Sequence, residues 1–579
     1  MANIFKTIRD RIKERGLNKL EKNLQILYDR KNISFNPLTV SSLVSPISDK
    51  NYSVRLMEHY VWYVGSLSLL LSFYRKNKAL YSTGEALDDY NYFWGNVPIE
   101  NRRVHSKLPQ IISNKMADML LYNGLDIDTQ VYTVNDKGER VVDEEQSRIV
   151  KNVLMSIYKD NDFKKLLRKS MTDESWSGDI AWKLIIDTSF SNKPIIQEVD
   201  TRNYEIITKY GKDIGIVFKE YYEKQNGKTT DHYVLEETYT KDENNNALIA
   251  YHLFKLDSAG KKQELPLGAL EETAPLLDNP LFDTETQTIT FNGLAEILAH
   301  RKPNRLPNAE FPNTNYGQSD YSGSCSLFDS LDETLSTMVD DIRKGRSLAF
   351  IPDTLIPRDM YGNVERFNDF KLRYQKVAGS DASTENENEI TEYNPSSKST
   401  EQLEKYKSIL MQVCNSVGLS PLTLGITGLE SIDASAQSQQ EREKVSIRTR
   451  NYKIGLWQEF LKKISKKVLK TYIYMQEITT TGEEIEDEEL KAIKELDIDN
   501  IEININFGDY ALKPFDERLR DYGSALQLGS ISIEKAVDLI YKDEMTEEQK
   551  QIEVDRLKMQ KGFSLANEDN LLSDIDLAL

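Results

Sequence analysis

The chain has 579 residues, 39% hydrophobic and 29% charged, which is ordinary for a soluble protein and allows two to four domains of ~150 residues each. Its 93 acidic residues outnumber its 74 lysines and arginines, and the net charge of −19 argues against a protein that coats DNA with a basic face. Two cysteines, Cys325 and Cys414, exclude a disulfide framework and a cysteine-rich zinc site, so we expect a reducing compartment.

The N-terminal region has no apolar run followed by a small-residue cleavage site, so we expect no signal peptide. Residues 1–27 predict a basic amphipathic helix that docks on the first domain rather than on a membrane. The most apolar stretch, Tyr60–Tyr74, is shorter than the ~20 residues that a spanning helix needs, and we interpret it as buried core. The sequence therefore predicts no membrane association.

The first third of the chain predicts helices followed by strands. Residues 54–125 favour helices, one of which begins near Leu108 and is ended by Gly124. Residues 131–142 alternate around a glycine-containing turn, a pattern typical of a hairpin.

Helix and strand then succeed each other again. Residues 148–175 predict helix, followed by a turn at Gly178 and a strand. Residues 204–255 predict an antiparallel meander, and residues 256–323 are rich in loops. Helices before an antiparallel sheet indicate a helix-rich α+β fold.

A long helix is predicted from about Ser326 to Lys344, with Gly345 as its stop. Successive residues of a helix are rotated by ~100°, so apolar and acidic residues separate onto two faces. The acidic face consists of Asp329, Asp332, Glu333 and Asp340.

A second and a third long helix are predicted downstream. One begins near Ser399 with an apolar stripe and ends at Gly418 and Pro421. The other continues to about Gln476, and its first half is polar on every side. Because such a helix is not a core helix, we expect this half to lie against water, a partner chain or a charged ligand. Its basic residues are Arg442, Lys444, Arg448 and Arg450.

The segments that connect the long helices also differ in composition and length. Residues 346–398 form a small insert between two long helices, and its second part is too poor in apolar residues to fold alone. The acidic stretch 477–502 is followed by a strand and three short helices. The break after Gly418 is longer than a plain connection between antiparallel helices, which takes 2–8 residues.

Catalytic signatures are nearly absent. Gly227–Thr229 reads GKT, but Tyr222 stands where a phosphate-binding loop needs glycine, so Asn226–Gly227 predicts a hairpin turn instead. The five histidines lack the spacing of a helical zinc site. We therefore predict no catalytic residues, no cofactor, no metal and no enzymatic activity.

In this order, the elements resemble those of portal proteins of tailed bacteriophages, most closely the siphophages of Gram-positive hosts. The early wing helix is similar to RRVHSKLPQIISNKMADMLL, and the following turn and strand to SWSGDIAWKLIID. The first stem helix is similar to YSGSCSLFDSLDETLSTMVDDIRKGRSLAFIP, and the end of the second to GLSPLTLGITG. The ordered set, which covers residues 102–557, carries the resemblance.

The resemblance implies a subunit with wing, stem, clip and crown regions around a central channel. Its expected boundaries are residues 1–322 for the wing, 323–345 for the first stem helix, 346–398 for the clip, 399–417 for the second stem helix, 418–436 for the tunnel loop, 437–514 for the long helix and wing return, and 515–579 for the crown.

The resemblance also implies a function and partners. Portal subunits assemble as a dodecameric ring at one vertex of the capsid in the virion, after synthesis in the host cytoplasm. The ring is a channel for DNA packaging and ejection. It contacts the major capsid and scaffolding proteins, docks the terminase large subunit, and later binds head-completion or adaptor proteins, while double-stranded DNA passes through it.

Four groups of residues receive roles by this resemblance. The acidic face of the first stem helix (Asp329, Asp332, Glu333, Asp340) would face the channel, where it would repel DNA. The clip interface would include Phe350, Ile351, Leu355 and Ile356. The four basic residues named above would contact phosphate or a neighbouring subunit. The tunnel loop that touches DNA would be Ile426, Thr427, Gly428, Leu429, Glu430, Ser431, Ile432 and Asp433.

Three alternatives stay open. Another virion connector or adaptor ring is usually much shorter than this chain. A packaging ATPase or nuclease needs a phosphate loop or clustered metal carboxylates, and neither pattern is visible. A helical cellular scaffold needs no specific motif at all.

Overall fold

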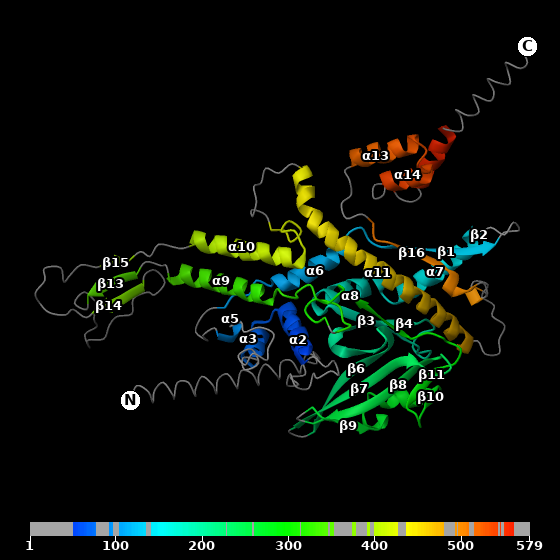
Figure 1. The fold of residues 1–579 in the computed structure, drawn as a ribbon, viewed down its shortest axis with the longest axis horizontal. Coiled ribbons are helices and arrows are strands. Elements are labelled where there is room, and N and C mark those ends of the chain that lie inside the picture. Colours follow the sequence, from blue (N-terminus) through cyan, green and yellow to red (C-terminus); the bar gives the residue numbers. More distant parts are fainter. Residues whose placement is uncertain are drawn as a thin grey trace, which may run out of the picture. The chain divides into compact units, whose positions relative to one another are not determined.

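The computed structural model has a mixed α and β architecture (Figure 1). Segments Met1–Phe507 and Gly508–Leu579 form two separate compact units. The residues that the structure describes are 50–76, 92–96, 103–134, 140–226, 229–257, 260–312, 314–344, 348–352, 373–377, 391–393, 399–426, 436–479, 493–494, 496–508, 515–541, 545 and 549–560.

The first unit consists of a body and a helical arm, and the arm contains two long helices and a small sheet that are described below. The body helices are α2 (Lys50–Val64), α3 (Leu67–Lys76), α5 (Phe93–Asn96), α6 (Leu108–Leu120), α7 (Glu144–Asp160), α8 (Phe163–Ser177) and α11 (Ala436–Thr479). The short 3-10 helices are η1 (Thr201–Asn203), η2 (Leu267–Ala269), η3 (Ala274–Asp278) and η5 (Ile498–Asn500).

The described strands of the body form three sheets. The largest has the order β10-β11-β8-β7-β6-β5, with β9 beside β8; a second has the order β12-β3-β4, and a third β16-β1-β2. Their bounds are β1 (Asp126–Val134), β2 (Arg140–Asp143), β3 (Asp179–Ile185), β4 (Ile195–Asp200), β5 (Tyr204–Lys209), β6 (Lys212–Asn226), β7 (Thr229–Lys241), β8 (Ala247–Leu256), β9 (Lys262–Leu265), β10 (Phe282–Asp283), β11 (Thr288–Phe291), β12 (Ala299–Pro303) and β16 (Glu502–Asn506).

The third sheet returns the chain to the body after α11. Strand β16 pairs antiparallel with β1 from Asp126 opposite Asn506 to Gln130 opposite Glu502. Helix α11 runs along the body in Figure 1, and its Gln458 donates a hydrogen bond to the Ile505 carbonyl at 2.8 Å. Residues almost 400 positions apart thus stabilise one another.

The core of the body is aromatic. All five tryptophans of the sequence are at most 1% exposed, and they come from α2, α5, α8, β3 and α11. The rings of Trp182 and Phe460 meet edge-on with centroids 5.0 Å apart, a geometry worth roughly 0.5–1.5 kcal/mol beyond burial. The face of α11 that enters this core repeats every three or four residues and comprises Trp457, Phe460, Leu461, Ile464, Val468, Leu469 and Met475.

The helical arm contains two long helices that lie side by side (Figure 1), α9 (Cys325–Lys344) and α10 (Ser399–Val417). They are antiparallel, because the Ser324 and Ser416 hydroxyls share a 2.7 Å hydrogen bond at one end and Gln402 donates to Asp341 at the other. Between them in sequence, β13 (Leu348–Pro352) pairs in parallel with β14 (Arg373–Val377) and antiparallel with β15 (Thr391–Tyr393).

The second unit is helical where it is described. It contains α13 (Phe515–Gln527), α14 (Ile533–Ile540) and a further helix over residues 549–560. The Ser532 side chain caps the first turn of α14 by accepting from Lys535 N. Arg518 donates to the Ile540 carbonyl at 2.7 Å, which ties α13 to the last turn of α14.

Most predicted elements are confirmed. The structure contains the mixed α and β architecture, the long helices that begin near Ser326, at Ser399 and at Ala436, the hairpin at 131–142, and the meander at 204–255. Val61, Trp62, Leu69, Leu70 and Phe73 confirm that the apolar stretch is core. In the described part of the chain, no helix is long and apolar enough to cross a bilayer.

Two boundaries differ. Helix α6 ends at Leu120, before Gly124, because Leu121 already leaves the helical region. The helical stretch at 148–175 is two helices, separated at Asp162, whose φ of 49° breaks the first helix. The expected N-terminal helix lies outside the described residues.

Candidate functional site: a buried polar joint

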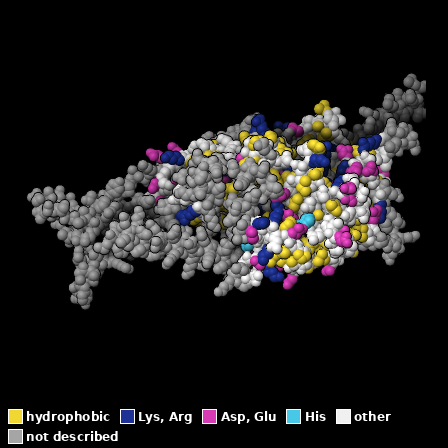
Figure 2. Space-filling model, turned by 60° about the horizontal axis from the view of Figure 1, so that its bottom comes forward, with side chains coloured by type: hydrophobic (Ala, Val, Ile, Leu, Met, Phe, Trp, Pro, Cys, Tyr) yellow, Lys and Arg dark blue, Asp and Glu magenta, His cyan; other side chains and the backbone are white. Residues whose placement is uncertain are grey.

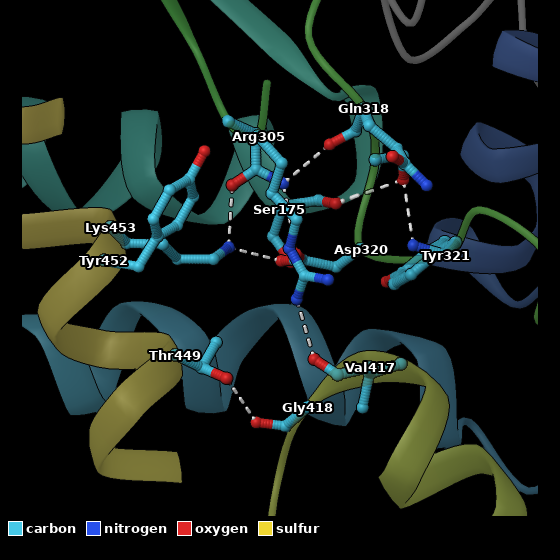
Figure 3. A network of polar contacts seen from close by, with 12 residues as sticks. Ser175, Arg305, Gln318, Asp320, Tyr321, Val417, Gly418, Thr449, Tyr452 and Lys453 are labelled. Carbon is cyan, nitrogen blue, oxygen red and sulfur yellow. Dashed lines mark hydrogen bonds and ion pairs between the residues drawn. The ribbon is translucent and has the colours of Figure 1, made fainter. Parts of the chain in front are cut away.

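Where the arm meets the body, α10 ends against a set of buried polar groups that we call the polar joint (Figure 3). These groups come from the end of α8, the loop after β12, the approach to α9, the end of α10 and the middle of α11. Its members are Ser175, Asn304, Arg305, Asp320, Val417, Gly418, Thr449 and Lys453.

A fully buried ion pair forms the centre of the joint. Lys453 Nζ lies 2.5 Å from Asp320 Oδ2 and donates to Asn304 Oδ1 at 2.7 Å, and both charged side chains are 0% exposed. Asn304 in turn donates to Asp320 Oδ1 at 3.1 Å. Since a buried charge is tolerated only when paired and hydrogen-bonded, these contacts explain how a lysine can occupy the core.

Asp320 has two further donors. Ser175 Oγ donates to its Oδ2 at 2.7 Å, and Arg305 Nε lies 3.0 Å from its Oδ1. Burial alone would raise the pKa of the Asp320 carboxyl, but Lys453, Arg305 and the Ser175 hydroxyl more than offset burial and hold that pKa below its ordinary value. The Asp320 carboxylate is therefore charged at neutral pH.

The same Arg305 reaches the end of α10. Its NH2 group donates to the Val417 carbonyl at 2.8 Å, in the last turn, where the helix dipole favours a positive charge. Gly418 ends α10 with a φ of 72°, and Leu419 N donates to the Cys414 carbonyl at 3.0 Å.

Helix α11 holds the same glycine. Thr449 Oγ1 donates to the Gly418 carbonyl at 2.7 Å. A Cβ atom at position 418 would lie 2.7 Å from the same Thr449 Oγ1. The joint thus fixes the end of α10 to α11 and, through Arg305, to the loop after β12.

A second buried ion pair lies one turn further along α11. Lys302 contacts Glu174, and Trp457 Nε1 donates to the other Glu174 oxygen at 2.8 Å. Lys302 also lies 4.7 Å from the centroid of the Trp457 ring, so the ring faces a cation. Burial raises the pKa of Glu174, and the positive charges of Lys302 and Lys453 offset only part of that increase.

The predicted acidic channel face is wrong for two of its four residues. Asp329 and Asp332 are 0% exposed and bind the body's own residues 93–106. Asp329 accepts hydrogen bonds from the Phe93 and Trp94 amides at 2.7 and 3.2 Å, capping α5. Two carboxyl groups buried in this way cannot also line an open channel.

Asp332 has more partners than Asp329. It lies 2.6 Å from His105 Nδ1 and accepts from Ser106 N at 3.0 Å and from Trp94 Nε1 at 3.2 Å. These side chains anchor α9 to the body. Of the predicted acidic face, Glu333 is exposed and Asp340 is half-buried.

The four predicted basic residues also differ in their exposure. Arg450 is 3% exposed and donates to the Met119 and Phe507 carbonyls at 2.9 and 3.0 Å, so its predicted contact with phosphate or a neighbouring subunit is wrong. Lys444 and Arg448 are exposed. The Arg442 side chain lies outside the described residues.

The expectation that the polar half of α11 avoids the core is likewise wrong. Ser446, Arg450 and Lys453 are all buried there. Arg450 donates to two backbone carbonyls, and Lys453 donates to Asp320 and to the side-chain oxygen of Asn304. Ser446 Oγ accepts from Ser420 N. Such partners satisfy a polar helix face as well as water does.

Several predicted residues cannot be placed. Thr427, Gly428, Leu429, Glu430, Ser431, Ile432, Asp433, Leu355 and Ile356 lie outside the described residues. Ile426 is half-buried, and its amide donates to the Pro421 carbonyl at 3.0 Å. Phe350 and Ile351 are in β13, and their side chains are not described.

No protein-family model matches this sequence, and no curated protein matches it closely enough to indicate a relationship. Within the described residues, no group of three or more His, Cys, Asp or Glu side chains has the geometry to hold a metal ion. The joint is therefore described by its own geometry: its charges are paired with one another, and its hydrogen bonds connect α10, α11 and the loop after β12.

Sequence reasoning missed Asp320, Asn304 and Lys453. The available signal was an isolated lysine, Lys453, one turn before Trp457 on the face that becomes apolar. A lysine at such a position indicates a buried partner, but its spacing does not identify which acidic residue of the chain supplies it.

Proposed function

We propose that this chain is the subunit of a bacteriophage portal, a ring that forms the channel for DNA at one capsid vertex. The observation that carries the proposal is the helical arm. It is an antiparallel pair of long helices, with a small mixed sheet inserted between them, followed by a loop and a 44-residue helix. This order supports two stem helices, a clip, a tunnel loop and a return to the wing.

The exposure of the arm supports assembly. No described side chain at positions 337–341 of α9 or 400–409 of α10 is buried, although several are apolar. Leu403 is 43% exposed, and Met338, Val339, Tyr406 and Ile409 are half-buried. An isolated helix pair cannot bury more, so neighbouring arms in a ring would cover these residues.

The polar joint supports a tunnel loop between α10 and α11. Thr449 Oγ1 donates to the Gly418 carbonyl, and Ser420 N donates to Ser446 Oγ at 2.8 Å. The segment that leaves α10 is therefore fixed to α11 before the proposed loop begins. In the proposed ring, residues 426–433 contact DNA from this fixed base. Arg448 and Lys444 on the adjoining turns of α11 would supply phosphate contacts or bonds between subunits.

The remaining roles follow from the same ring. The clip, residues 346–398, would dock the terminase large subunit and later the head-completion or adaptor proteins, and the wing would meet major capsid and scaffolding proteins. Glu333 and Asp340 are the two members of the acidic face that the subunit itself leaves accessible to a channel. No catalytic step is assigned to the ring, which acts as a passive channel in the virion.

Native mass measurement and electron microscopy of the purified chain test the proposal. We expect one closed ring of about a dozen copies with an open centre, because a head-to-tail interface that closes gives a ring. Leu403→Glu places a charge between neighbouring arms and should reduce the ring to smaller species. Phe190→Glu, at a residue that is 80% exposed on a turn, is the matched control and should leave rings intact. A monomer that hydrolyses nucleotides would overturn the proposal, and so would an open filament.

A further inference from the structure

A half-open cleft of about 330 Å³ lies between α11, β12, the start of β6 and η5. Helix α11 contributes Lys463, Lys466 and Lys467, and β12 contributes His300 and Arg301. These five nitrogen-bearing side chains come from two elements and surround one space. We call it the basic cleft, and it is separate from the polar joint.

Two cations of the basic cleft, Lys466 and Lys467, keep N–H donors that the described residues do not use. The other two are paired, Lys463 with Glu459 at 2.6 Å and Arg301 with Asp179 and Asp213 at 2.9 and 2.6 Å. Lys467 Nζ donates to the Ile297 and Ala299 carbonyls at 2.8 and 2.9 Å, and Lys466 Nζ donates to the Asp499 carbonyl at 2.8 Å. Neither ammonium group makes an ion pair with a described carboxylate within 4.0 Å. An ammonium group has three N–H donors, so one on Lys467 and two on Lys466 remain.

His300 adds a ring to the same wall. Its imidazole stacks on Phe460 with centroids 5.6 Å apart and an interplanar angle of 9°. Neither ring nitrogen has a hydrogen-bond partner among the described residues, although His300 lines the cleft. Burial, and to a smaller extent the charges of Lys467, Lys463 and Arg301, lower the pKa of His300 to about 3, so its imidazole is neutral at neutral pH.

Burial, aided by Lys241, Lys463 and Lys470, also lowers the pKa of Lys467, to about 8, although Glu296 opposes the shift. The remaining N–H donors of Lys466 and Lys467 point to an additional anion as their partner, beside the carboxylates that already line the cleft. We infer that the basic cleft binds a small phosphate monoester, with its phosphate group on the three lysines and its uncharged part against the apolar wall. This inference goes beyond the proposed portal function and does not depend on it.

Size and charge favour a small ligand over duplex DNA. A volume of about 330 Å³ exceeds what one inorganic phosphate fills and lies at the lower end of small-molecule sites. Ile216 and Ile297 supply apolar lining. Carboxylates of Asp213, Glu296 and Asp499, which are 34%, 23% and 70% exposed, also line the cleft. They oppose every bound anion, and they oppose the many phosphates of a long polyanion more than one phosphate group held by the lysines.

Calorimetric titration of the full chain tests the inference, with ribose 5-phosphate as the probe and ribose as its uncharged counterpart. We expect saturable binding of the phosphate at about 1 mM or tighter and no binding of ribose. Lys463→Gln should weaken that binding at least about tenfold, because a charge-assisted hydrogen bond is lost. The Lys463 side chain is 53% exposed, so this variant keeps the fold.

Lys462→Gln, at the neighbouring position outside the cleft, is the matched control and should bind like the wild type. Equal binding of ribose and ribose 5-phosphate would overturn the inference, as would equal losses in the two variants or no binding at all. Displacement of the phosphate by duplex DNA, with DNA binding lost in Lys463→Gln, would make the cleft a nucleic-acid contact instead and would also overturn it. None of these outcomes depends on whether the chain forms rings.

Discussion

Replacing Lys453 by methionine tests the polar joint directly. Methionine has a similar length and no charge, so Lys453→Met removes the ammonium group with little change in volume. It deletes the 2.5 Å contact with Asp320 and the 2.7 Å hydrogen bond to Asn304. Asp320 then remains buried with one fewer cation.

The cost follows from what remains around Asp320. Breaking a buried ion pair on one side costs about 3–5 kcal/mol, because the other charge stays desolvated. Here Arg305 and Ser175 still bind the carboxylate, and the Arg305 side chain is 27% exposed to solvent. We therefore expect the lower end, a loss of about 3 kcal/mol in the free energy of unfolding. Adding Asp320→Asn should recover part of that loss, with a coupling of at least about 1 kcal/mol.

Urea unfolding followed by tryptophan fluorescence measures this effect. All five tryptophans are buried in the first unit, so the signal reports the body and not residues 508–579. Lys463→Met removes an exposed lysine ten positions along the same helix and should change stability by less than about 0.5 kcal/mol. A loss in Lys453→Met no larger than in this control would refute the reasoning, as would strictly additive effects of Lys453→Met and Asp320→Asn.

Three further predictions follow from neighbouring contacts. Gly418→Ala should destabilise the body by at least about 1 kcal/mol in the same urea assay, because alanine is strained at the positive φ of this position and its Cβ would lie 2.7 Å from Thr449 Oγ1. An unchanged free energy of unfolding would contradict this role of Gly418 at the end of α10. Burial raises the pKa of Asp329 to about 8, so the folded chain holds a proton that the unfolded chain has lost, and the stability due to this group should fall between about pH 4 and pH 8. Asp329→Asn should flatten that part of the stability profile, and an unchanged profile would show that the carboxyl is already ionised. Arg450→Met should cost about 2–3 kcal/mol, because two buried carbonyls lose a charged donor, whereas exposed Lys444→Met should cost little.

Local signals in the sequence located the helices well. Helix α10 begins at Ser399 and ends at Val417, as its cap and the following Gly418 predict. Such features depend on neighbours within a few residues, so the sequence contains them directly. The apolar stripe of α11 from Trp457 onward is predicted for the same reason, since helix geometry alone places its members on one face.

The burial of charged residues could not be predicted from the same patterns. Asp329 and Asp332 share a polar face of α9, which normally indicates solvent, and their partners are amides 226 to 236 residues earlier in the chain. Lys453 finds Asp320 across 133 residues. Every residue except proline has a backbone amide, so the sequence does not show which amide donates to a distant carboxylate. Only the folded chain identifies these pairs.

The spacing of the polar joint along the chain has a consequence for the order of folding. Ser175, Arg305 and Asp320 are synthesised well before Lys453, so the buried carboxylate lacks its main cation until α11 leaves the ribosome. Contacts between distant residues form late, because closing long loops costs entropy before those contacts are made. The body therefore completes its core, and the arm acquires its fixed base, only when most of the chain exists. Truncated products that end before α11 would lack Lys453 and Thr449, and with them the contacts that fix the base of the arm.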